Sequence, residues 1–374
     1  MPRLPQLCRI AACAMLGVAL VAGTAQEPFV WDLPPGFPEP WVPADNPMTA
    51  AKVELGRRLF YDPRLSANRT QSCGSCHRQE LAFTDGRARG LGSTGEEHPR
   101  GSMSLANVAY APTLTWAHPT LDSLELQARV PLFGVDPVEL GQAGREEALL
   151  EILRRSEPYP ELLGVAFPSD AGPFSVERIL DALACFERTI LSGRSPYDRY
   201  HFGSDASAIS PAAQRGEILF FSGEKAGCFQ CHGGFNFSGP VRTAAQPDPP
   251  RLFHNTGLYN LPGTLSYPPP NTGIHAHTGR PEDVGKFRTP TLRNIAVTAP
   301  YMHDGSVATL EQAIEHYAAG GRHGDNPLKS RAIRRRELSP DEKRDLLEFL
   351  RSLTDQTLLT DPRWSDPWTA RPKK

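Results

Sequence analysis

Two short segments of the sequence carry a pair of cysteines followed at once by a histidine. The first is CGSCH, with Cys73, Cys76 and His77, and the second is CFQCH, with Cys228, Cys231 and His232. Cys-x-x-Cys-His is the attachment signature of c-type haem, although paired cysteines also form zinc sites or disulfides. Two thiols at this spacing can bond the two vinyl groups of one porphyrin, and the next imidazole can ligate the iron. Because the complete motif occurs twice, about 155 residues apart, we predict two covalent haems c.

Each haem of this kind leaves one axial position of its iron for a second ligand. An electron carrier fills that position with His or Met, whereas a haem that reacts with peroxide keeps it open or easily emptied. In TLEQAIEHYAAGG (309–321), one helical stripe holds Leu310, Ala313, Ile314 and Tyr317. This spacing predicts that Tyr317 points inward and that His316, about 100° away around the helix, lies at the surface. By spacing alone, Tyr317 is a core aromatic residue rather than a ligand.

The residues before the two motifs predict the elements that position them. VELGRRLFYDPRLSANRTQSCGSCH (53–77) and AAQRGEILFFSGEKAGCFQCH (212–232) both predict a helix, a Leu-Phe pair, a loop and then the motif. This loose repeat indicates a duplicated cytochrome c unit. We therefore predict an N-terminal cytochrome c-like domain over 26–205 and a C-terminal one over 206–374.

The rest of the sequence predicts helices and loops. FSVERILDALACFERTILSG (174–193) has an apolar stripe of helical period, and LSPDEKRDLLEFLRSL (338–353) begins with a capping box. Cys185 lies at the edge of the first stripe and is predicted to be a packed apolar residue. Strand signals are few, and the chain has 37 Pro and 32 Gly, so the fold class is mainly α with long Pro/Gly-rich loops. Exposed positions in one such loop are expected for His254, His275 and His277.

The first 25 residues have the features of a secretory signal peptide. Arg3 and Arg9 precede the apolar run IAACAMLGVALVAG, and small residues stand before a cleavage point after Ala25. We therefore expect export to the periplasm, which also suits covalent haem attachment. No later stretch is long and apolar enough to span a bilayer. The formal net charge of -2 gives no indication of nucleic-acid binding.

Four segments of the sequence together resemble one known family. They are LGRRLFYDPRLS, LACFERTILSGRSPYDRY, FRTPTLRNIAVTAPYMHDGS and LEQAIEHY. These segments are similar to the bacterial di-haem cytochrome c peroxidase/MauG family, and the similarity covers nearly the whole mature chain. VPLFGVDPVELG and GSTGEEHPRGSMSLANVAYAPTLTW resemble most the MauG-like branch that is found beside methanobactin genes. The resemblance implies an oxidoreductase that depends on hydrogen peroxide.

The resemblance also implies the axial ligands. Peroxidases of the family carry Met, and MauG carries Tyr, at the position of Tyr317, which is then the second ligand of the haem held by His232. The haem held by His77 is implied to be the peroxide site. The family's distal histidine has no counterpart in this sequence, because the nearest histidine, His98, does not match its position. The first haem is therefore expected to be five-coordinate.

Proton transfer and electron transfer at the peroxide site have implied residues as well. The family's Gln and Glu fall on Gln127 and Glu139, with Pro131 between them, and Glu139 is expected to move protons to and from peroxide. The loop from Pro131 to Glu139 is two residues longer here than in the family pattern. Trp116 matches the tryptophan that lies between the two haems and relays electrons or holes.

The family also binds calcium between the haems. The backbone carbonyls of Thr298 and Pro300 match two of its donors, and hard cations such as Ca²⁺ take oxygen ligands. The family's Asn donor falls on Gly101, which has no side-chain oxygen, and this departure puts the calcium site in question.

The resemblance as a whole implies a particular activity. Hydrogen peroxide would generate a high-valent di-iron state, which would oxidise a Trp of a partner protein to kynurenine. That partner would be a small exported copper-binding protein. Two alternatives remain open at this point. One is a peroxide-scavenging cytochrome c peroxidase that takes electrons from a small donor protein, and the other is a non-catalytic di-haem electron-transfer cytochrome.

Overall fold

The computed structural model describes residues 29–168, 172–262 and 266–369, and the predicted signal peptide, 1–25, lies outside them. Within these ranges the fold is mainly helical, as predicted, with thirteen α-helices and one antiparallel pair of short strands. The first half contains α1 (Ala50–Phe60), α2 (Cys73–Cys76), α3 (Leu124–Phe133), α4 (Glu146–Arg154), α5 (Tyr159–Ala166), α6 (Val176–Arg188) and α7 (Pro196–His201). The second half contains α8 (Pro211–Phe221), α9 (Phe229–His232), β1 (Phe253–His254), α10 (His275–Thr278), β2 (Phe287–Arg288), α11 (Leu310–Ala318), α12 (Pro340–Ser352) and α13 (Gln356–Thr360).

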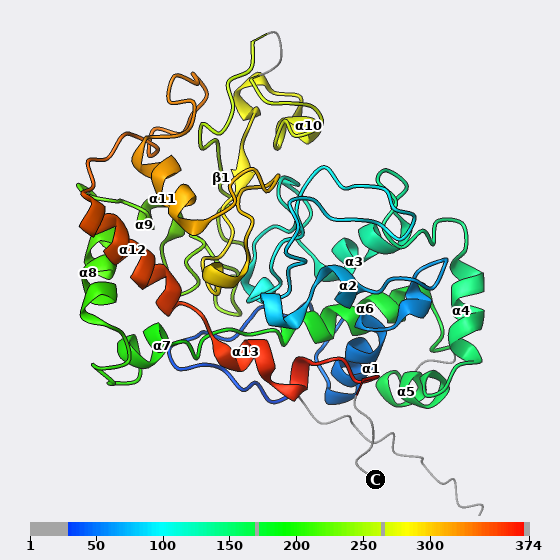
Figure 1. Cartoon of the computed structure of the whole chain (residues 1–374). Coiled ribbons are helices and arrows are strands. Elements are labelled where there is room, and N and C mark those ends of the chain that lie inside the picture. Colours follow the sequence, from blue (N-terminus) through cyan, green and yellow to red (C-terminus); the bar gives the residue numbers. More distant parts are fainter. Residues whose placement is uncertain (1–28, 169–171, 263–265, 370–374) are drawn as a thin grey trace, which may run out of the picture.

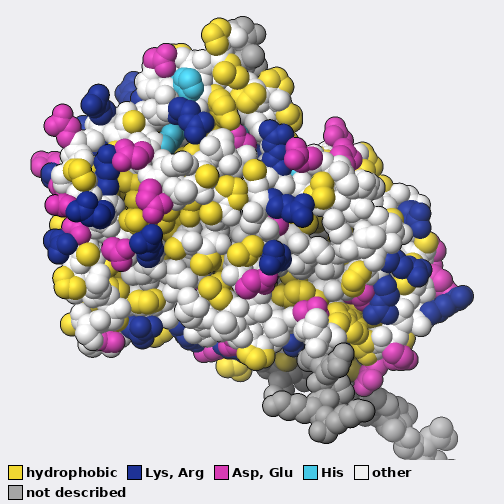
Figure 2. All heavy atoms as spheres, viewed as in Figure 1, with side chains coloured by type: hydrophobic (Ala, Val, Ile, Leu, Met, Phe, Trp, Pro, Cys, Tyr) yellow, Lys and Arg dark blue, Asp and Glu magenta, His cyan; other side chains and the backbone are white. Residues whose placement is uncertain are grey.

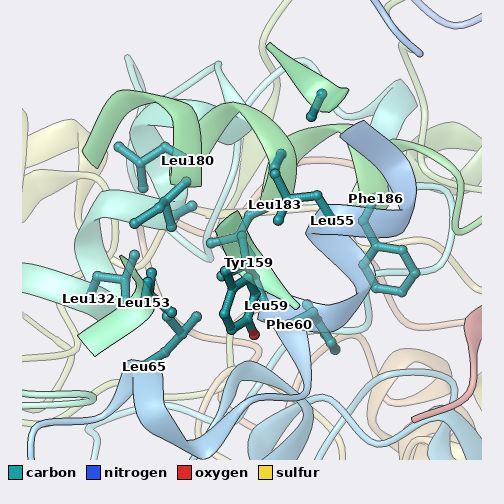
Figure 3. Close-up of a cluster of buried hydrophobic side chains, with 14 of the residues drawn as sticks. Leu55, Leu59, Phe60, Leu65, Leu132, Leu153, Tyr159, Leu180, Leu183 and Phe186 are labelled. Carbon is teal, nitrogen blue, oxygen red and sulfur yellow. The ribbon is translucent and has the colours of Figure 1, made fainter. Parts of the chain in front are cut away.

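The core of the first half forms where α1 crosses α6. The stripe predicted for 174–193 is buried in α6, and Cys185 is fully buried with it, as expected. At the crossing, a Cβ on Gly56 would lie 1.9 Å from the carbonyl oxygen of Ala182, so only glycine allows this approach. Figure 3 shows the side chains of α1 and α6 meeting those of α3, α4 and α5 in one apolar cluster.

The second half repeats this arrangement with α8 and α12. A Cβ on Gly216 would lie 2.0 Å from the carbonyl oxygen of Asp345 in α12. Gly56 and Gly216 each stand three residues before the Leu-Phe pair that precedes a Cys-x-x-Cys-His motif. The two halves therefore position their motifs with the same helix pair and the same glycine contact. The domain division at 205/206 remains a prediction.

The C-terminal segment returns to the first half of the molecule. In Figure 1, α13 follows the end of α12 and lies beside the blue segment that begins the described chain. Leu358 and Trp364 belong to the apolar cluster of the first half. The Trp364 Nε1 donates to the carbonyl oxygen of Thr189 over 2.9 Å, and the Gln79 Nε2 donates to that of Leu358 over 2.9 Å. The last helix therefore links the two halves.

The surface carries charges of both signs. Figure 2 shows Lys and Arg side chains interspersed with Asp and Glu side chains across the face in view. This mixture agrees with the formal net charge of -2. In the part of the chain that the structure describes, we find no helix with the length and apolar character that crossing a membrane requires.

Candidate active site

The histidines of the two motifs are oriented by the same kind of backbone contact. The Nδ1 of His77 lies 2.8 Å from the carbonyl oxygen of Phe83, and that of His232 lies 2.9 Å from the carbonyl oxygen of Phe237. Because a carbonyl oxygen can only accept, Nδ1 carries the proton and Nε2 keeps its lone pair for a metal. Burial lowers the pKa of both imidazoles, that of His232 to about 4. Both rings are therefore neutral at pH 7, the form that ligates iron.

The four cysteines of the motifs lie just before these two histidines in the chain. Cys73 and Cys76 begin and end the one-turn helix α2, and Cys228 and Cys231 occupy the corresponding positions around α9. All four side chains are half-buried, and burial raises the pKa of the Cys76 thiol to about 11 and that of the Cys228 thiol to about 12. Among the described residues, no group of three or more His, Cys, Asp or Glu is arranged to hold a metal ion.

A cavity of about 260 Å³ opens beside the second motif. His232, Cys231 and Tyr317 line it together. The apolar part of its wall is formed by Phe220, Leu258, Ile314, Leu346 and Leu350. The Tyr317 hydroxyl makes no hydrogen bond to any described residue and faces this space. Burial raises the pKa of the phenol, which therefore keeps its proton unless a cation lies beside it. The inward orientation predicted for Tyr317 is confirmed.

The surface position predicted for His316 is wrong. The residue is buried, with 6 % of its area exposed, and its Nδ1 accepts the backbone N–H of Arg322 over 3.1 Å. After α11 ends, the chain folds back over this side of the helix, where the N–H of Gly321 donates to the His316 carbonyl oxygen over 2.9 Å. A neighbouring loop covers the turn as well, since a Cβ on Gly321 would lie 2.7 Å from the carbonyl oxygen of Thr256. The periodicity of one helix cannot show that other segments of the chain cover one of its faces.

Trp116 lies on the wall of the same cavity. Its Nε1 donates to the carbonyl oxygen of Gly101 over 2.8 Å. Thr298 and Pro300, the residues predicted to bind calcium, line the cavity too. Neither of their carbonyl oxygens accepts a hydrogen bond from the described residues, whereas the Gly101 carbonyl is occupied by Trp116. The two carbonyl oxygens implied as calcium donors therefore accept no hydrogen bond, whereas the carbonyl oxygen of Gly101 already accepts one.

Glu139 lies near the first motif. The loop after α3 folds back, because the N–H of Leu140 donates to the carbonyl oxygen of Pro131 over 2.9 Å. Burial is the main influence on the pKa of Cys73 and of His77, and the negative charge of Glu139 acts on both in addition. The carboxylate of Glu139 thus acts electrostatically on the first Cys-x-x-Cys-His.

Gln127 lies on α3, which also carries Pro131. It is half-buried, and its side chain makes no hydrogen bond to the described residues. Gln127 and the Glu139 loop therefore belong to one unit, in which α3 supports the loop.

Comparison with known proteins agrees with this geometry. The sequence pattern of the family described as di-haem cytochrome c peroxidase matches residues 50–206. The chain is 36% identical to the cytochrome-c peroxidase IdrP1 of Denitromonas iodatirespirans, covering 94% of each chain. It is 35% identical to the methylamine utilization protein MauG of Methylorubrum extorquens, covering 83% of this chain and 80% of that one. The chain belongs to the di-haem cytochrome c peroxidase/MauG family.

A solved structure extends the comparison to three dimensions. It is described as a MauG-like protein associated with microbial copper homeostasis, and it superposes with a TM-score of 0.88 at 46% identity, over 91% of this chain and 99% of that one. Family membership implies two covalent haems. The protein is thus a MauG-like di-haem peroxidase, an oxidoreductase that uses hydrogen peroxide.

The cavity beside the second motif fits a haem of this family. One part of its wall is apolar, and another part carries Arg288, whose Nε donates to the Thr115 carbonyl oxygen over 3.1 Å and whose Nη2 lies 3.2 Å from the Met103 sulfur. No carboxylate of the described residues pairs with Arg288, and burial lowers its pKa to about 10. A buried cation without an anion is costly. The two carboxylates of a haem would supply that anion, and its porphyrin would fill the apolar part.

Replacing Arg288 by Met should lower the reduction potential of the haem that His232 would hold. Without the cation, the ferric form loses an unfavourable neighbour, and a tenfold shift of the ferric/ferrous equilibrium corresponds to about 59 mV for one electron. We expect a decrease of about this size in spectroelectrochemical titrations. Arg288→Lys keeps the charge and should stay closer to wild type. Equal potentials in wild type and Arg288→Met would contradict the assignment.

The sequence gives no indication that Arg288 and His254 line the cavity, and His303 lines it as well. The sequence gives Arg288 no role, since its partner group is not an amino acid. His254, expected to be exposed, is half-buried in β1 and lines the cavity, and the Nε2 atoms of both His254 and His303 are buried without a hydrogen-bond partner among the described residues. The His303 ring stacks on Phe287 at 3.9 Å between centroids. No periodic signal marks any of the three.

Proposed function

We propose that this di-haem peroxidase acts in the periplasm and oxidises a protein substrate, converting a Trp of a partner to kynurenine. The observation that carries the proposal is Tyr317, which shares one cavity with His232 and has a hydroxyl without a protein partner. When bound, the two haems would supply the reaction with peroxide and hold its oxidising equivalents. The chain's residues decide whether those equivalents are stored or passed to an electron carrier.

A tyrosine ligand favours storage of the oxidising equivalents. The phenolate oxygen is a hard, anionic donor that stabilises oxidised iron, whereas the thioether sulfur of Met stabilises the reduced form. Because burial raises the pKa of Tyr317, ionisation of the phenol requires a cation in the cavity. An iron held by His232 would be that cation. Tyr317 is therefore proposed as its second ligand.

The remaining residues have proposed roles in binding and proton transfer. Cys73 and Cys76 would bond the first haem, and Cys228 and Cys231 the second. Near His77, Glu139 would take a proton from peroxide and return it to the leaving oxygen, with Gln127 and Pro131 beside its loop.

Two further roles concern the space between the haems. Trp116 would pass electrons between the two sites, since it lines the cavity and is fixed by its bond to Gly101. Calcium would bind the carbonyl oxygens of Thr298 and Pro300. A titration with a calcium chelator, followed by haem absorbance, tests the latter role.

The partner is proposed to be a small exported copper-binding protein. Its support is the 46% identity to a MauG-like protein that is itself described as associated with copper homeostasis. The test incubates the haem-loaded protein with hydrogen peroxide and such a partner from the same organism. Peptide mass spectrometry should find kynurenine in place of one Trp, only when both enzyme and peroxide are present. A partner that remains unmodified while the enzyme consumes peroxide would contradict the proposal.

The second candidate is a peroxide scavenger fed by a small electron-donor protein. The 36% identity to the cytochrome-c peroxidase IdrP1 favours it. It would oxidise reduced cytochrome c in steady turnover. A third reading, an electron-transfer cytochrome without chemistry, requires that the protein does not react with peroxide at all.

Tyr317→Met separates storage from scavenging. In the wild-type diferric protein, peroxide should produce an oxidised state that persists long enough for spectra to be recorded. In Tyr317→Met this state should be lost, and oxidation of reduced cytochrome c should increase, because sulfur favours reduced iron. Stopped-flow absorbance measures both. Tyr301→Phe, which changes another tyrosine of the same cavity wall, is the control and should behave as wild type. Rapid decay in wild type with fast cytochrome c oxidation would favour the scavenger.

A further inference from the structure

A short hairpin, residues 90–98, lies against the loop that carries Glu139. The hairpin is closed by the N–H of His98, which donates to the Gly90 carbonyl oxygen over 2.8 Å. Its tip contacts the loop through the N–H of Ser93, which donates to the Glu139 carbonyl oxygen over 2.7 Å. A Cβ on Gly92 would lie only 1.9 Å from the carbonyl oxygen of Val138. The 90–98 hairpin and the Glu139 loop are therefore in close backbone contact.

This contact brings His98 to the Glu139 side chain. The Nε2 of His98 lies 3.0 Å from the Oε1 of Glu139, and the two side chains are 27% and 30% exposed. Nε2 itself is buried, and the angles at this pair are not yet those of a hydrogen bond. Contacts of catalytic groups are often poorly aligned before substrate binds. Because the imidazole is partly exposed, it can still exchange protons with water.

The other charged groups of the hairpin have partners of their own. Glu97 pairs with Arg89 over 3.1 Å. The carboxylate of Glu96 accepts the N–H of Val138 over 3.1 Å, which ties the hairpin to the loop a second time. Glu139 is thus the carboxylate that the described residues present to His98.

We propose that His98 is a positioning residue for Glu139 at the peroxide site. This inference rests on the proposed role of Glu139 as the base. The imidazole N–H would direct one carboxylate oxygen and leave the other free to take the proton of peroxide. His98, which does not match the position of the family's distal ligand, would then position the base Glu139 instead.

The experiment uses the haem-loaded full chain with His98→Ala and His98→Gln. Two rates are measured between pH 5 and 8: the reaction with peroxide, and the association of cyanide followed by haem absorbance. Hydrogen cyanide binds as its anion, so its proton must also pass to a base, and this second rate does not depend on turnover. Loss of a residue that orients a functional group typically costs about 10–100-fold. We expect a decrease of this size in both rates for His98→Ala.

His98→Gln distinguishes positioning from packing. Glutamine can still donate an N–H to Glu139, so both rates should fall less in His98→Gln than in His98→Ala. His277→Ala removes an exposed histidine from α10 and should match wild type. Wild-type rates in His98→Ala, or equal losses in His98→Ala and His98→Gln, would overturn the inference.

A further variant separates this inference from the proposed function. If Glu139→Gln collapses both rates while the His98 variants do not, only the role of His98 fails. If Glu139→Gln also leaves both rates unchanged, the proposed base is wrong, and the role of His98 fails with it.

Discussion

Replacing Glu139 by Gln should slow the reaction of the haem-loaded protein with hydrogen peroxide by about 10²–10⁴-fold, the usual contribution of a positioned acid or base. The amide has the shape of the carboxylate but does not accept a proton. The loop should keep its conformation, because its bonds to Pro131 and Ser93 are made by backbone atoms. The loss should therefore be chemical rather than structural. Stopped-flow absorbance at several peroxide concentrations measures the second-order rate constant.

Glu97→Gln provides a matched control on the neighbouring hairpin. Glu97 is 61% exposed and pairs with Arg89, away from the Glu139 carboxylate. The control should react with peroxide at the wild-type rate, and both variants should keep the wild-type haem spectrum. Equal rate constants for Glu139→Gln and Glu97→Gln would show that the base lies elsewhere.

Sequence reasoning succeeded where the signal was local. The Cys-x-x-Cys-His motifs are short and complete, and the residues before them predicted the helices α1 and α8. The helical period correctly predicted that the Tyr317 side chain points toward the interior. A ligand role for that residue came only from family resemblance, since spacing shows where a side chain points but not what it binds.

Failures of sequence reasoning have long-range causes. His316 was placed at the surface because its cover, the chain after α11 and the loop at Thr256, is not part of its helix. The return of the C-terminal segment to the first half depends on contacts such as Trp364 with Thr189, 175 positions apart. The role of Arg288 could not be predicted from the sequence for a different reason. A buried arginine without a carboxylate is visible only when the surrounding side chains are known.

Arg293→Met should destabilise the protein by about 3–5 kcal/mol, the usual result of removing one member of a buried ion pair. The side chain is fully buried, and its Nη1 donates to the Oδ2 of Asp198 over 2.9 Å. Its Nε donates to the Phe235 carbonyl oxygen over 3.0 Å, and the guanidinium lies 4.7 Å from the centre of the Phe37 ring. Methionine would fill much of this space but would leave the Asp198 carboxylate buried without its cation. Chemical denaturation of the haem-loaded protein measures the loss.

An exposed arginine gives the control for this prediction. Arg363 pairs with Asp32 and Asp361 at the surface, and exposed pairs contribute about 0–1 kcal/mol. Arg363→Met should therefore unfold close to wild type. Similar losses in the free energy of unfolding for Arg293→Met and Arg363→Met would contradict the larger cost predicted for removing one member of the buried pair.

The double variant Arg293→Met/Asp198→Leu tests the physical reason. If most of the cost comes from leaving Asp198 unpaired, removing both charges should recover part of the stability, as in other buried pairs. The haem spectrum should report a second effect. Arg293 holds the backbone at Phe235, two residues before the Phe237 carbonyl that orients His232. Both variants lack the hydrogen bond from Arg293 to the Phe235 carbonyl oxygen. The absorbance of the second haem should therefore stay perturbed in the double variant, even though part of its stability is recovered. A double variant with both properties restored would show that the unpaired Asp198 carboxylate, rather than the lost contact of Arg293, perturbs the site of His232.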